Sequence, residues 1–328
     1  MSTIEDLKLS LSDFQSASSL IYKHLLPTPQ LLWPLLSMRC GCEVWTKHEN
    51  YLPTGSFKVR GGIWYMDQLI NSVGKISGVV AATRGNHGQS VAFSAKINRI
   101  KAQIVIPFNN SVQKNRAMHG YGAELIEYGE DFNFAWEYAQ ALAKKSGLHL
   151  FPSFHPLLVQ GVGTYGLEFL KAVPTLHTVY VPIGLGSGIC GMIAARNALN
   201  LKTEIVGVVS EKAPAYALSY KNKKLEKTKY CNTLADGLAV RTPDELALEF
   251  ILKNVARVVT VSDGQIIDAI KIYYTDTHNI AEGAGASPLA ALLKEKDKMF
   301  GKKIGVVLTG GNLDHSLMIH ALSSERSD

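Results

Sequence analysis

Residues 178–191 read Thr-Val-Tyr-Val-Pro-Ile-Gly-Leu-Gly-Ser-Gly-Ile-Cys-Gly, a β-branched apolar run followed directly by a glycine-rich loop. The run predicts a buried strand over residues 178–183, and the apolar residues after the loop predict a helix. The glycines let backbone N–H groups approach an anion, and the N-terminus of the following helix adds partial positive charge. This stretch therefore predicts a phosphate-binding loop at the end of a strand in an α/β fold.

The same loop fits a second pattern. Gly186, Gly188 and Gly191 have the G-x-G-x-x-G spacing of dinucleotide-binding loops. On that interpretation Glu211, at the end of the next predicted strand, would bind a ribose and the protein would be an NAD-dependent dehydrogenase. A tight strand-to-helix turn without a ligand is a further alternative.

The strand-then-helix pattern continues through most of the chain. Short β-branched runs predict strands at residues 43–47, 78–82, 103–106, 124–127, 178–183, 204–209, 257–261 and 303–308. Longer helical patterns between them include residues 58–71, 88–97, 133–145, 188–199 and 263–275. Nearly unbroken apolar strands that alternate with helices are typical of parallel sheets covered on both faces, so the predicted fold class is α/β. Because such sheets bind ligands at the carboxyl ends of their strands, the loops that follow the strands are the candidate site.

Composition narrows the class of protein. The chain has 328 residues, 46% of them hydrophobic and 19% charged, which argues against disorder and against a small disulfide scaffold. Glycines and a proline interrupt the most apolar stretch, and the first ten residues lack an apolar core, so we expect a cytoplasmic protein and no membrane association. The net charge of +6 owes much to a lysine-rich run at residues 221–229 without interleaved aromatics, so we expect no nucleic-acid partner. Four cysteines without zinc-type spacing predict reduced thiols and no metal.

Two polar loops add candidate chemistry. Residues 55–62, Gly-Ser-Phe-Lys-Val-Arg-Gly-Gly, place Lys58 at a predicted helix start, where a lysine is electrostatically unfavourable unless it has a role such as imine formation. A surface lysine is the alternative. Residues 83–89, Thr-Arg-Gly-Asn-His-Gly-Gln, follow a predicted strand and suit binding of a carboxylate or a ring oxygen through backbone amides and the Asn86 side chain. A capped turn is the alternative there.

The order of these motifs resembles the fold-type-II pyridoxal-phosphate enzymes, specifically the threonine/serine dehydratase and serine racemase branch. The matching segments, quoted as family pattern and position here, are S-F-K-x-R-G-A at 56–62, S-x-G-N-H-x-Q at 83–89, the glycine-rich loop at 184–188, D-G-x-A-V at 236–240, E-P-x-G-A at 282–286 and S-G-G-N at 309–312. The resemblance covers residues 27–312. It implies a tryptophan-synthase-β-like fold of two parallel-sheet α/β domains with the cofactor in the cleft between them. Its large domain would be residues 1–53 and 151–328, and its small inserted domain residues 54–150.

The resemblance also implies a role for each matched position. Lys58 would be the catalytic residue, holding the cofactor covalently and later moving the α-proton. Asn86 would bond the ring oxygen of the cofactor, and the Thr309 hydroxyl would meet its pyridine nitrogen, which favours elimination over transamination because a hydroxyl does not protonate the ring as an aspartate would. The other expected cofactor-binding residues are Phe57, Gly184, Leu185, Gly186, Ser187, Gly188, Gly237 and Glu282. The expected substrate-binding residues are Thr83, Arg84 and His87.

Three departures from the family pattern bear on function. Arg84 stands where racemases of this branch carry a serine, which argues against racemisation. Val209 stands where the metal-binding glutamate of the racemase type would fall, although Glu211 could replace it. The sequence ends at Asp328, soon after the last motif, so we expect no regulatory domain and no feedback control by an end-product amino acid.

Together the motifs imply a pyridoxal 5'-phosphate-dependent ammonia-lyase that forms a homodimer. Its substrate would be a β-hydroxy-α-amino acid of the threonine, serine or 3-hydroxyaspartate type, converted to a 2-oxo acid and ammonia. The alternatives are an amino-acid racemase of the same fold, a non-catalytic sensor that binds the cofactor or an amino acid, and the NAD-dependent dehydrogenase. The dehydrogenase leaves Lys58 and Asn86 without a role.

Overall fold

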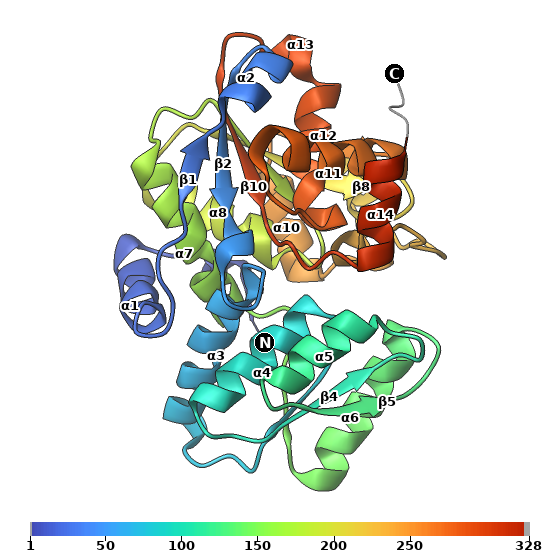
Figure 1. Cartoon of the computed structure of the whole chain (residues 1–328). Helices are drawn as coiled ribbons and strands as arrows, with labels where there is room; N and C mark the ends of the chain where they lie inside the picture. The colour runs from blue at the N-terminus through green and yellow to red at the C-terminus, as the bar shows by residue number, and fades with distance from the viewer. Residues whose placement is uncertain (1, 325–328) are drawn as a thin grey trace.

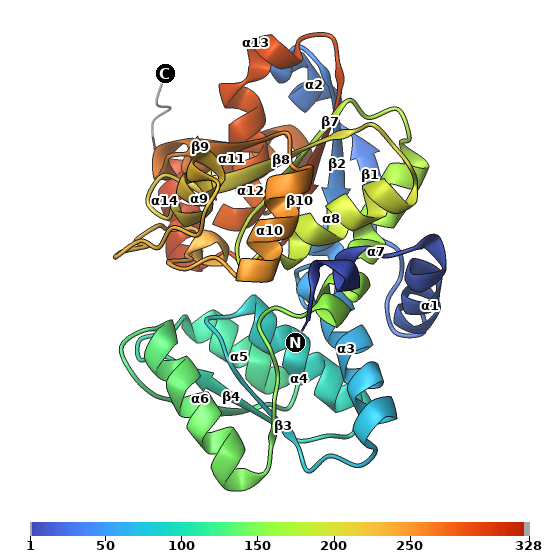
Figure 2. The ribbon, with the colours of Figure 1, turned by 180° about the vertical axis from the view of Figure 1, so that it is seen from behind.

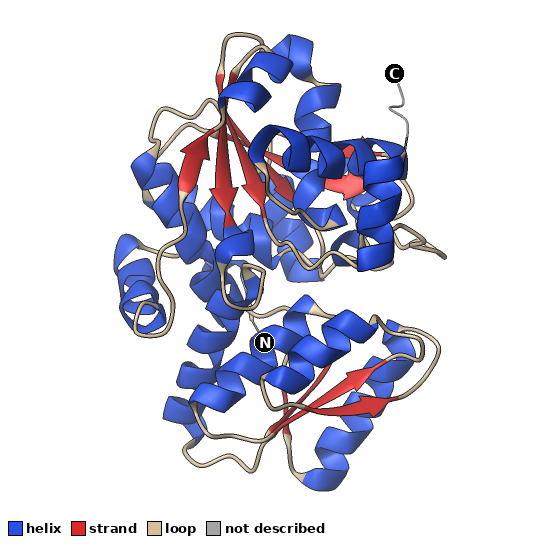
Figure 3. Cartoon of the chain, viewed as in Figure 1, coloured by secondary structure: helices blue, strands red, loops and turns tan. Residues whose placement is uncertain are grey.

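Two β-sheets with helices on both faces form the framework of the computed structural model, which describes residues 2–324 (Figure 3). The larger sheet has the strand order β1-β2-β10-β7-β8-β9, and the smaller has the order β5-β4-β3-β6. Neighbouring strands run parallel except β1, which pairs with β2 in the antiparallel sense. The strands are β1 Gln30–Leu32, β2 Glu43–His48, β3 Val79–Ala82, β4 Ala102–Ile106, β5 Glu124–Glu127, β6 His149–Leu150, β7 Thr178–Pro182, β8 Glu204–Ser210, β9 Arg257–Val261 and β10 Lys303–Leu308.

Helices connect nearly all of these strands. The α-helices are α1 Leu11–Ile21, α2 Pro34–Cys40, α3 Lys58–Val73, α4 Asn86–Ile97, α5 Val112–Gly120, α6 Phe132–Ser146, α7 Pro156–Ala172, α8 Ser187–Ala198, α9 Ala215–Asn222, α10 Glu245–Asn254, α11 Asp263–Thr277, α12 Gly283–Lys294, α13 Lys296–Met299 and α14 His315–Ser323. Short 3-10 helices are η1 Ile4–Leu7, η2 Glu49–Tyr51 and η3 Asp236–Leu238. In the described residues no helix is both long enough and apolar enough to cross a membrane.

The smaller sheet is buried on both faces, as its apolar strands require. Along β3, Val79 and Ala81 pack into the cluster that includes residues of α3 and α4, whereas Val80 and Ala82 pack against the alanines of α6. This alternation of side chains fixes the register of β3. It therefore also fixes where the polar loop after β3 begins.

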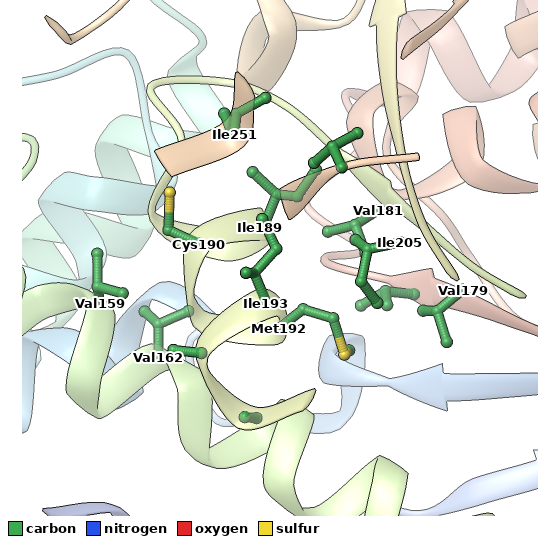
Figure 4. Packing of buried hydrophobic residues seen from close by; sticks show 14 of the residues in the cluster. Val159, Val162, Val179, Val181, Ile189, Cys190, Met192, Ile193, Ile205 and Ile251 are labelled. Atoms are coloured by element: carbon green, nitrogen blue, oxygen red, sulfur yellow. The ribbon is translucent and has the colours of Figure 1, made fainter. Parts of the chain in front are cut away.

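The larger sheet is covered in the same way. On one face, Ile189 and Ile193 of α8 pack with Val179, Val181 and Ile205 of the sheet (Figure 4). On the other face, buried side chains of α11 and α12 pack against β7, β8 and β10. Because α8 lies flat on this apolar surface, its first turn and the glycine-rich loop before it are held at the carboxyl end of β7.

The chain builds the smaller sheet as an excursion from the larger one. It leaves the larger sheet after β2, forms β3 to β6, and returns through α7, which lies with α3 where the two sheets meet (Figures 1 and 2). The exact domain boundaries at residues 54 and 150 stay a prediction. All eight predicted strands are present with ends within one residue of those expected, and the predicted helices end within two residues.

Candidate active site

A cavity of about 290 Å³ lies between the two sheets. Its wall is built from the loops that follow β3 and β7, from the start of α3, and from residues next to η3 and α12. The sequence-predicted residues on this wall are Lys58, Thr83, Arg84, Asn86, His87, Leu185, Gly237 and Glu282. The fold thus brings together motifs that are more than 200 residues apart in the chain, between Lys58 and Glu282.

Lys58 is the first residue of α3, and its main chain is held from two sides. The Phe57 N–H donates to the Thr309 carbonyl at 3.0 Å, and the Ser90 hydroxyl donates to the Lys58 carbonyl at 2.7 Å. The ammonium lies 5.0 Å from the Phe57 ring centroid and makes no hydrogen bond within residues 2–324. Burial lowers the pKa of Lys58 to about 8, although Glu282 opposes the shift. A lysine with this pKa is about one-tenth free amine at pH 7, far more than an ordinary lysine.

Glu282 and Asn86 form a hydrogen-bonded chain opposite the lysine. Asn86 Nδ2 donates to Glu282 Oε1 at 2.7 Å, and Asn312 Nδ2 donates to Asn86 Oδ1 at 2.8 Å. Burial raises the pKa of Glu282 to about 7, while Lys114 and Asn86 act in the opposite direction. The Asn86 amide is therefore held in one orientation, with one Nδ2 hydrogen still free for another acceptor.

The glycine-rich loop forms a close-packed turn at the start of α8. Gly186, the N-cap residue, has φ of 108°, and a Cβ atom there would lie 2.6 Å from the Ala247 Cβ. A Cβ on Gly184 would lie 2.3 Å from the Gly237 carbonyl oxygen, so this position also accepts only glycine. The loop thus presents backbone N–H groups and the positive end of α8 to an anion.

The polar loop after β3 is shaped by its own side chains. The Thr83 hydroxyl accepts hydrogen bonds from the Gly85 and Gly88 N–H groups at 3.0 and 3.3 Å, so it sets the turn. His87 Nε2 is buried and unpartnered within the described residues, and burial together with nearby Lys58 lowers the pKa of His87 to about 3. Arg84 has a half-exposed side chain on the cavity wall, with Nη1 3.8 Å from Asp236 Oδ1.

The remaining predicted residues lie behind the cavity wall or beside it. Gly184, Gly186, Ser187 and Gly188 flank Leu185, and the position of a Gly188 Cβ would be 3.4 Å from the Phe57 ring. Thr309 is 2% exposed. Its main chain bonds to Phe57, so the two motifs meet even though neither residue lines the cavity.

Sequence reasoning missed several charged residues of the cavity wall. Lys114 Nζ lies 2.7 Å from Asp236 Oδ2, and Arg241 Nη2 lies 3.3 Å from Asp131 Oδ2. Both pairs join a segment of the smaller sheet to a segment beside the larger one. Lys114, Asp131 and Arg241 belong to no recognisable motif, so the sequence carried no signal for them, whereas Asp236 begins the matched segment 236–240.

Comparison with known proteins places the chain in a family. The family model described as "Pyridoxal-phosphate dependent enzyme" matches residues 21–310. The chain belongs to this family. The L-threonine ammonia-lyase of Thermotoga maritima is 35% identical over 311 residues, which cover 94% of this chain and 77% of that protein.

Solved structures of the family share the whole fold. The processed form of threonine deaminase isoform 2 from Solanum lycopersicum superposes with a TM-score of 0.91 and is 29% identical, covering 98% of this chain and 94% of that one. Maize serine racemase superposes with a TM-score of 0.89 and is 28% identical, covering 96% of this chain and 97% of that one. The predicted fold-type-II α/β fold and the predicted family branch are confirmed.

The enzyme depends on pyridoxal phosphate, and the site fits that cofactor. Among the described residues, neither the Lys58 amine on the cavity wall nor the buried His87 Nε2 has a hydrogen-bond partner. The glycine cradle at the start of α8 has the chemistry that a phosphate group requires. Family membership excludes the NAD-dependent dehydrogenase, so the G-x-G-x-x-G spacing at Gly186 is a coincidence within the glycine-rich loop.

Proposed function

We propose that this protein is an ammonia-lyase that converts a β-hydroxy-α-amino acid to a 2-oxo acid and ammonia. The observation that carries the proposal is a low-pKa Lys58, without a hydrogen bond in residues 2–324, on the wall of a cavity that Leu185 of the glycine-rich loop also lines. The names of the relatives, an L-threonine ammonia-lyase and a threonine deaminase, support the same reaction. The substrate is of the threonine, serine or 3-hydroxyaspartate type.

When bound, pyridoxal phosphate withdraws electrons from the Cα atom of an amino acid and so makes its Cα–H bond acidic. Lys58 Nζ would hold the cofactor and, once freed by the substrate amine, would accept the Cα proton. That proton would be returned to the hydroxyl on Cβ, which would leave as water, and a water molecule would then hydrolyse the released enamine to the 2-oxo acid and ammonia. Backbone amides of residues 83–87 bind the substrate carboxylate, with Thr83, Arg84 and His87 on the substrate side. Binding of the carboxylate at this loop orients the Cα–H bond toward the lysine, and this orientation contributes to the rate enhancement.

The glycine-rich loop and the hydrogen-bonded chain of Asn86 and Glu282 supply the other binding roles. Gly184, Leu185, Gly186, Ser187 and Gly188 bind the phosphate group with the N-terminus of α8. Asn86 bonds the ring oxygen with its free Nδ2 hydrogen while Glu282 holds the amide in place. The residues that pack around the ring are Phe57, Gly237 and Thr309, with the Thr309 hydroxyl toward the ring nitrogen.

The test is a screen of the purified enzyme with threonine, serine and 3-hydroxyaspartate for 2-oxo acid and ammonia. We expect equal amounts of both products from at least one substrate. Lys58→Ala should lose covalent cofactor and nearly all activity while it stays folded, whereas Lys144→Ala, an exposed lysine on α6, should behave as the parent enzyme does. A cofactor adduct that borohydride still fixes in Lys58→Ala would disprove the role of the lysine.

The same screen separates the other candidates. A racemase would change the configuration of serine or aspartate without releasing 2-oxo acid. A sensor would show a visible cofactor band that no amino acid alters and would release no product. Arg84 at the position of the racemase serine favours the lyase.

We also propose that the protein is a cytoplasmic homodimer. The four cysteines are free thiols, which supports a reducing compartment. The dimer is supported by apolar side chains exposed beside the edge strand β1.

A further inference from the structure

Four charged residues are buried together behind the first turn of α3. Lys47, Glu49 and Arg60 have fully buried side chains, and the Glu168 side chain is 10% exposed. We call these residues the Arg60 cluster. They come from β2, η2, α3 and α7, so the cluster joins four elements of the fold.

Arg60 is the centre of the cluster because every N–H of its guanidinium has an acceptor. Nε and Nη2 donate to the two Glu49 oxygens at 2.7 and 3.0 Å, and Nη1 and Nη2 donate to the two Glu168 oxygens at 2.6 and 3.0 Å. Nη1 also donates to the Thr164 hydroxyl at 3.2 Å, and Nη2 to the Thr28 hydroxyl at 3.3 Å. Such a double fork fixes the plane of the guanidinium.

The two acids are themselves held by further donors. Lys47 Nζ donates to Glu168 and to the Thr28 carbonyl, and the Tyr22 hydroxyl donates to Glu168 at 2.6 Å. Burial alone would raise the pKa of Glu168, but Arg60 and Lys47 outweigh it and lower that pKa. Two cations thus face two anions. A buried set of this kind is weak evidence for stability, because apolar side chains of similar volume are often as stable.

The cluster is tied to the reactive lysine through the helix. Lys58 and Arg60 are two residues apart in the same turn of α3, so their side chains leave on nearly opposite sides, one into the cavity and one into the cluster. A change in the rotation of this turn about the helix axis would therefore move both side chains at once.

The contact between α3 and α7 is close on both sides. A Cβ on Gly61 would lie 2.8 Å from the Leu158 carbonyl, and a Cβ on Gly161 would lie 2.7 Å from the Arg60 carbonyl, so the two backbones touch. Side chains of both helices also pack at this contact, because Val162 Cγ2 lies 2.9 Å from the position of a Gly61 Cβ and Trp64 Cβ lies 2.8 Å from that of a Gly161 Cβ. The Arg60 cluster adds hydrogen bonds of fixed direction to this packing, so the rotation of the first turn depends on both.

We propose that Arg60 is a positioning residue that sets the rotation of the first turn of α3 and thereby aims Lys58 Nζ into the cavity. The proposal rests on the proposed function only where catalysis is measured. Attachment of the cofactor to Lys58 depends on the same orientation of Lys58 Nζ and needs no amino-acid substrate.

The test compares Arg60→Lys with Arg257→Lys. Lysine keeps the positive charge but cannot fork onto two carboxylates. Arg257 is a matched control because it donates to Glu295, Glu204 and Tyr180 at the amino ends of β8 and β9, away from the cavity. For each variant we would measure the melting temperature, the rate of cofactor attachment to the apoprotein by absorbance, and kcat and KM separately.

We expect attachment rate and kcat of Arg60→Lys to fall by about tenfold or more with KM nearly unchanged, since a misplacement of about 1 Å can cost roughly 100-fold. Arg257→Lys should keep both rates within about twofold at a similar loss of melting temperature. Equal attachment rates and equal kcat values in the two variants would overturn the proposal.

A second variant tests the proposal if Arg60→Lys does not fold. Glu49→Gln keeps the shape of one carboxylate but removes its charge and one of the two oxygens that accept from Arg60. Slower attachment in this variant supports the proposal, and an unchanged rate overturns it. If the parent enzyme attaches the cofactor but consumes no hydroxy amino acid, the proposed function fails, and the attachment rates still decide the role of Arg60.

Discussion

At the scale of single residues, burial moves Lys58 and Glu282 toward their neutral forms. It lowers the pKa of Lys58 to about 8 and raises that of Glu282 to about 7. The two groups are coupled, because the Glu282 carboxylate favours the charged lysine and so raises the pKa of Lys58. Above pH 7 the carboxylate is mostly ionised, so this interaction is present in the range where Lys58 titrates.

This coupling predicts the pH dependence of cofactor attachment. Only the free amine attacks an aldehyde, so the rate should rise with pH and reach half its maximum near pH 8. Glu282→Gln removes the carboxylate that stabilises the ammonium, and the midpoint should therefore move to lower pH. Stopped-flow absorbance on the apoprotein from about pH 6 to 10 measures the midpoint of the attachment rate. Glu127→Gln, a change of an exposed residue, is the control. A midpoint that stays or rises would contradict the coupling.

Arg84 predicts which substrate is preferred. Its half-exposed guanidinium lies on the cavity wall, and Asp236 is 3.8 Å away, which is a loose ion pair. A second substrate carboxylate, as in 3-hydroxyaspartate, would give Arg84 a bidentate partner. Because the guanidinium is half-exposed, loss of such a pair costs on the order of 1 kcal/mol, which is about fivefold in specificity.

Arg84→Ser should accordingly lower kcat/KM for 3-hydroxyaspartate about fivefold more than for threonine or serine. The three substrates are compared on the same enzyme preparation, so cofactor content cancels. Equal losses on all three, or none, would mean that the Arg84 side chain does not select the substrate, and that a monocarboxylic hydroxy amino acid is the natural one.

At the scale of elements, the sequence predicts what local pattern encodes. Strands such as β7 and β10 are continuous apolar runs, and they lie where those runs do. The missed strands are β1, with three residues, and β6, with two. Neither is long enough to show a period of two, so only pairing with β2 and β3 makes them strands.

For the site, too, the sequence predicts some features and not others. The loops after β3 and β7 could be recognised because glycines and polar residues stand together in the sequence. The Arg60 cluster and the Lys114–Asp236 pair could not, since Arg60 and Glu168 are 108 residues apart and Lys114 and Asp236 are 122 apart. A lone lysine or arginine in a helical sequence gives no sign of its partner.

The carboxyl end of β8 predicts that catalysis does not need a divalent metal. Val209 is buried, and Glu211 Oε1 lies 3.5 Å from Lys294 Nζ. Nearby, Lys212 Nζ lies 2.9 Å from Asp263 Oδ2, so lysines already pair with these carboxylates. In residues 2–324 no group of three or more His, Cys, Asp or Glu side chains is arranged to hold a metal ion.

Dialysis against a chelator should accordingly leave kcat/KM nearly unchanged, because hard cations need several oxygen ligands. Metal analysis of the dialysed enzyme controls for incomplete removal. Activity that collapses and returns with magnesium or calcium would show that Glu211 exchanges its lysine for a cation, and Glu211→Ala would then be inactive.

At the scale of the whole molecule, one group of exposed apolar side chains lies at and around the edge strand β1. Strand β1 is the edge of the larger sheet and carries Leu31 and Leu32, 36% and 42% exposed. Around it, Leu26 and Met38 are 80% and 79% exposed, and Leu35 of α2 is 52% exposed. Exposed apolar side chains beside an open strand edge are typical of a surface that another chain covers.

We predict that a second copy of this chain covers that surface, so the mass in solution should be twice 35.8 kDa. A stable dimer buries roughly 1,600 Å² in total, with an apolar centre from which charged groups are largely absent. Met38→Glu places an unpaired carboxylate in that centre and should shift the protein to the monomer in size-exclusion chromatography with light scattering. Ile319→Glu, 54% exposed on α14 across the larger sheet, should stay dimeric. A monomeric parent protein, or the same mass for both variants, would contradict the prediction.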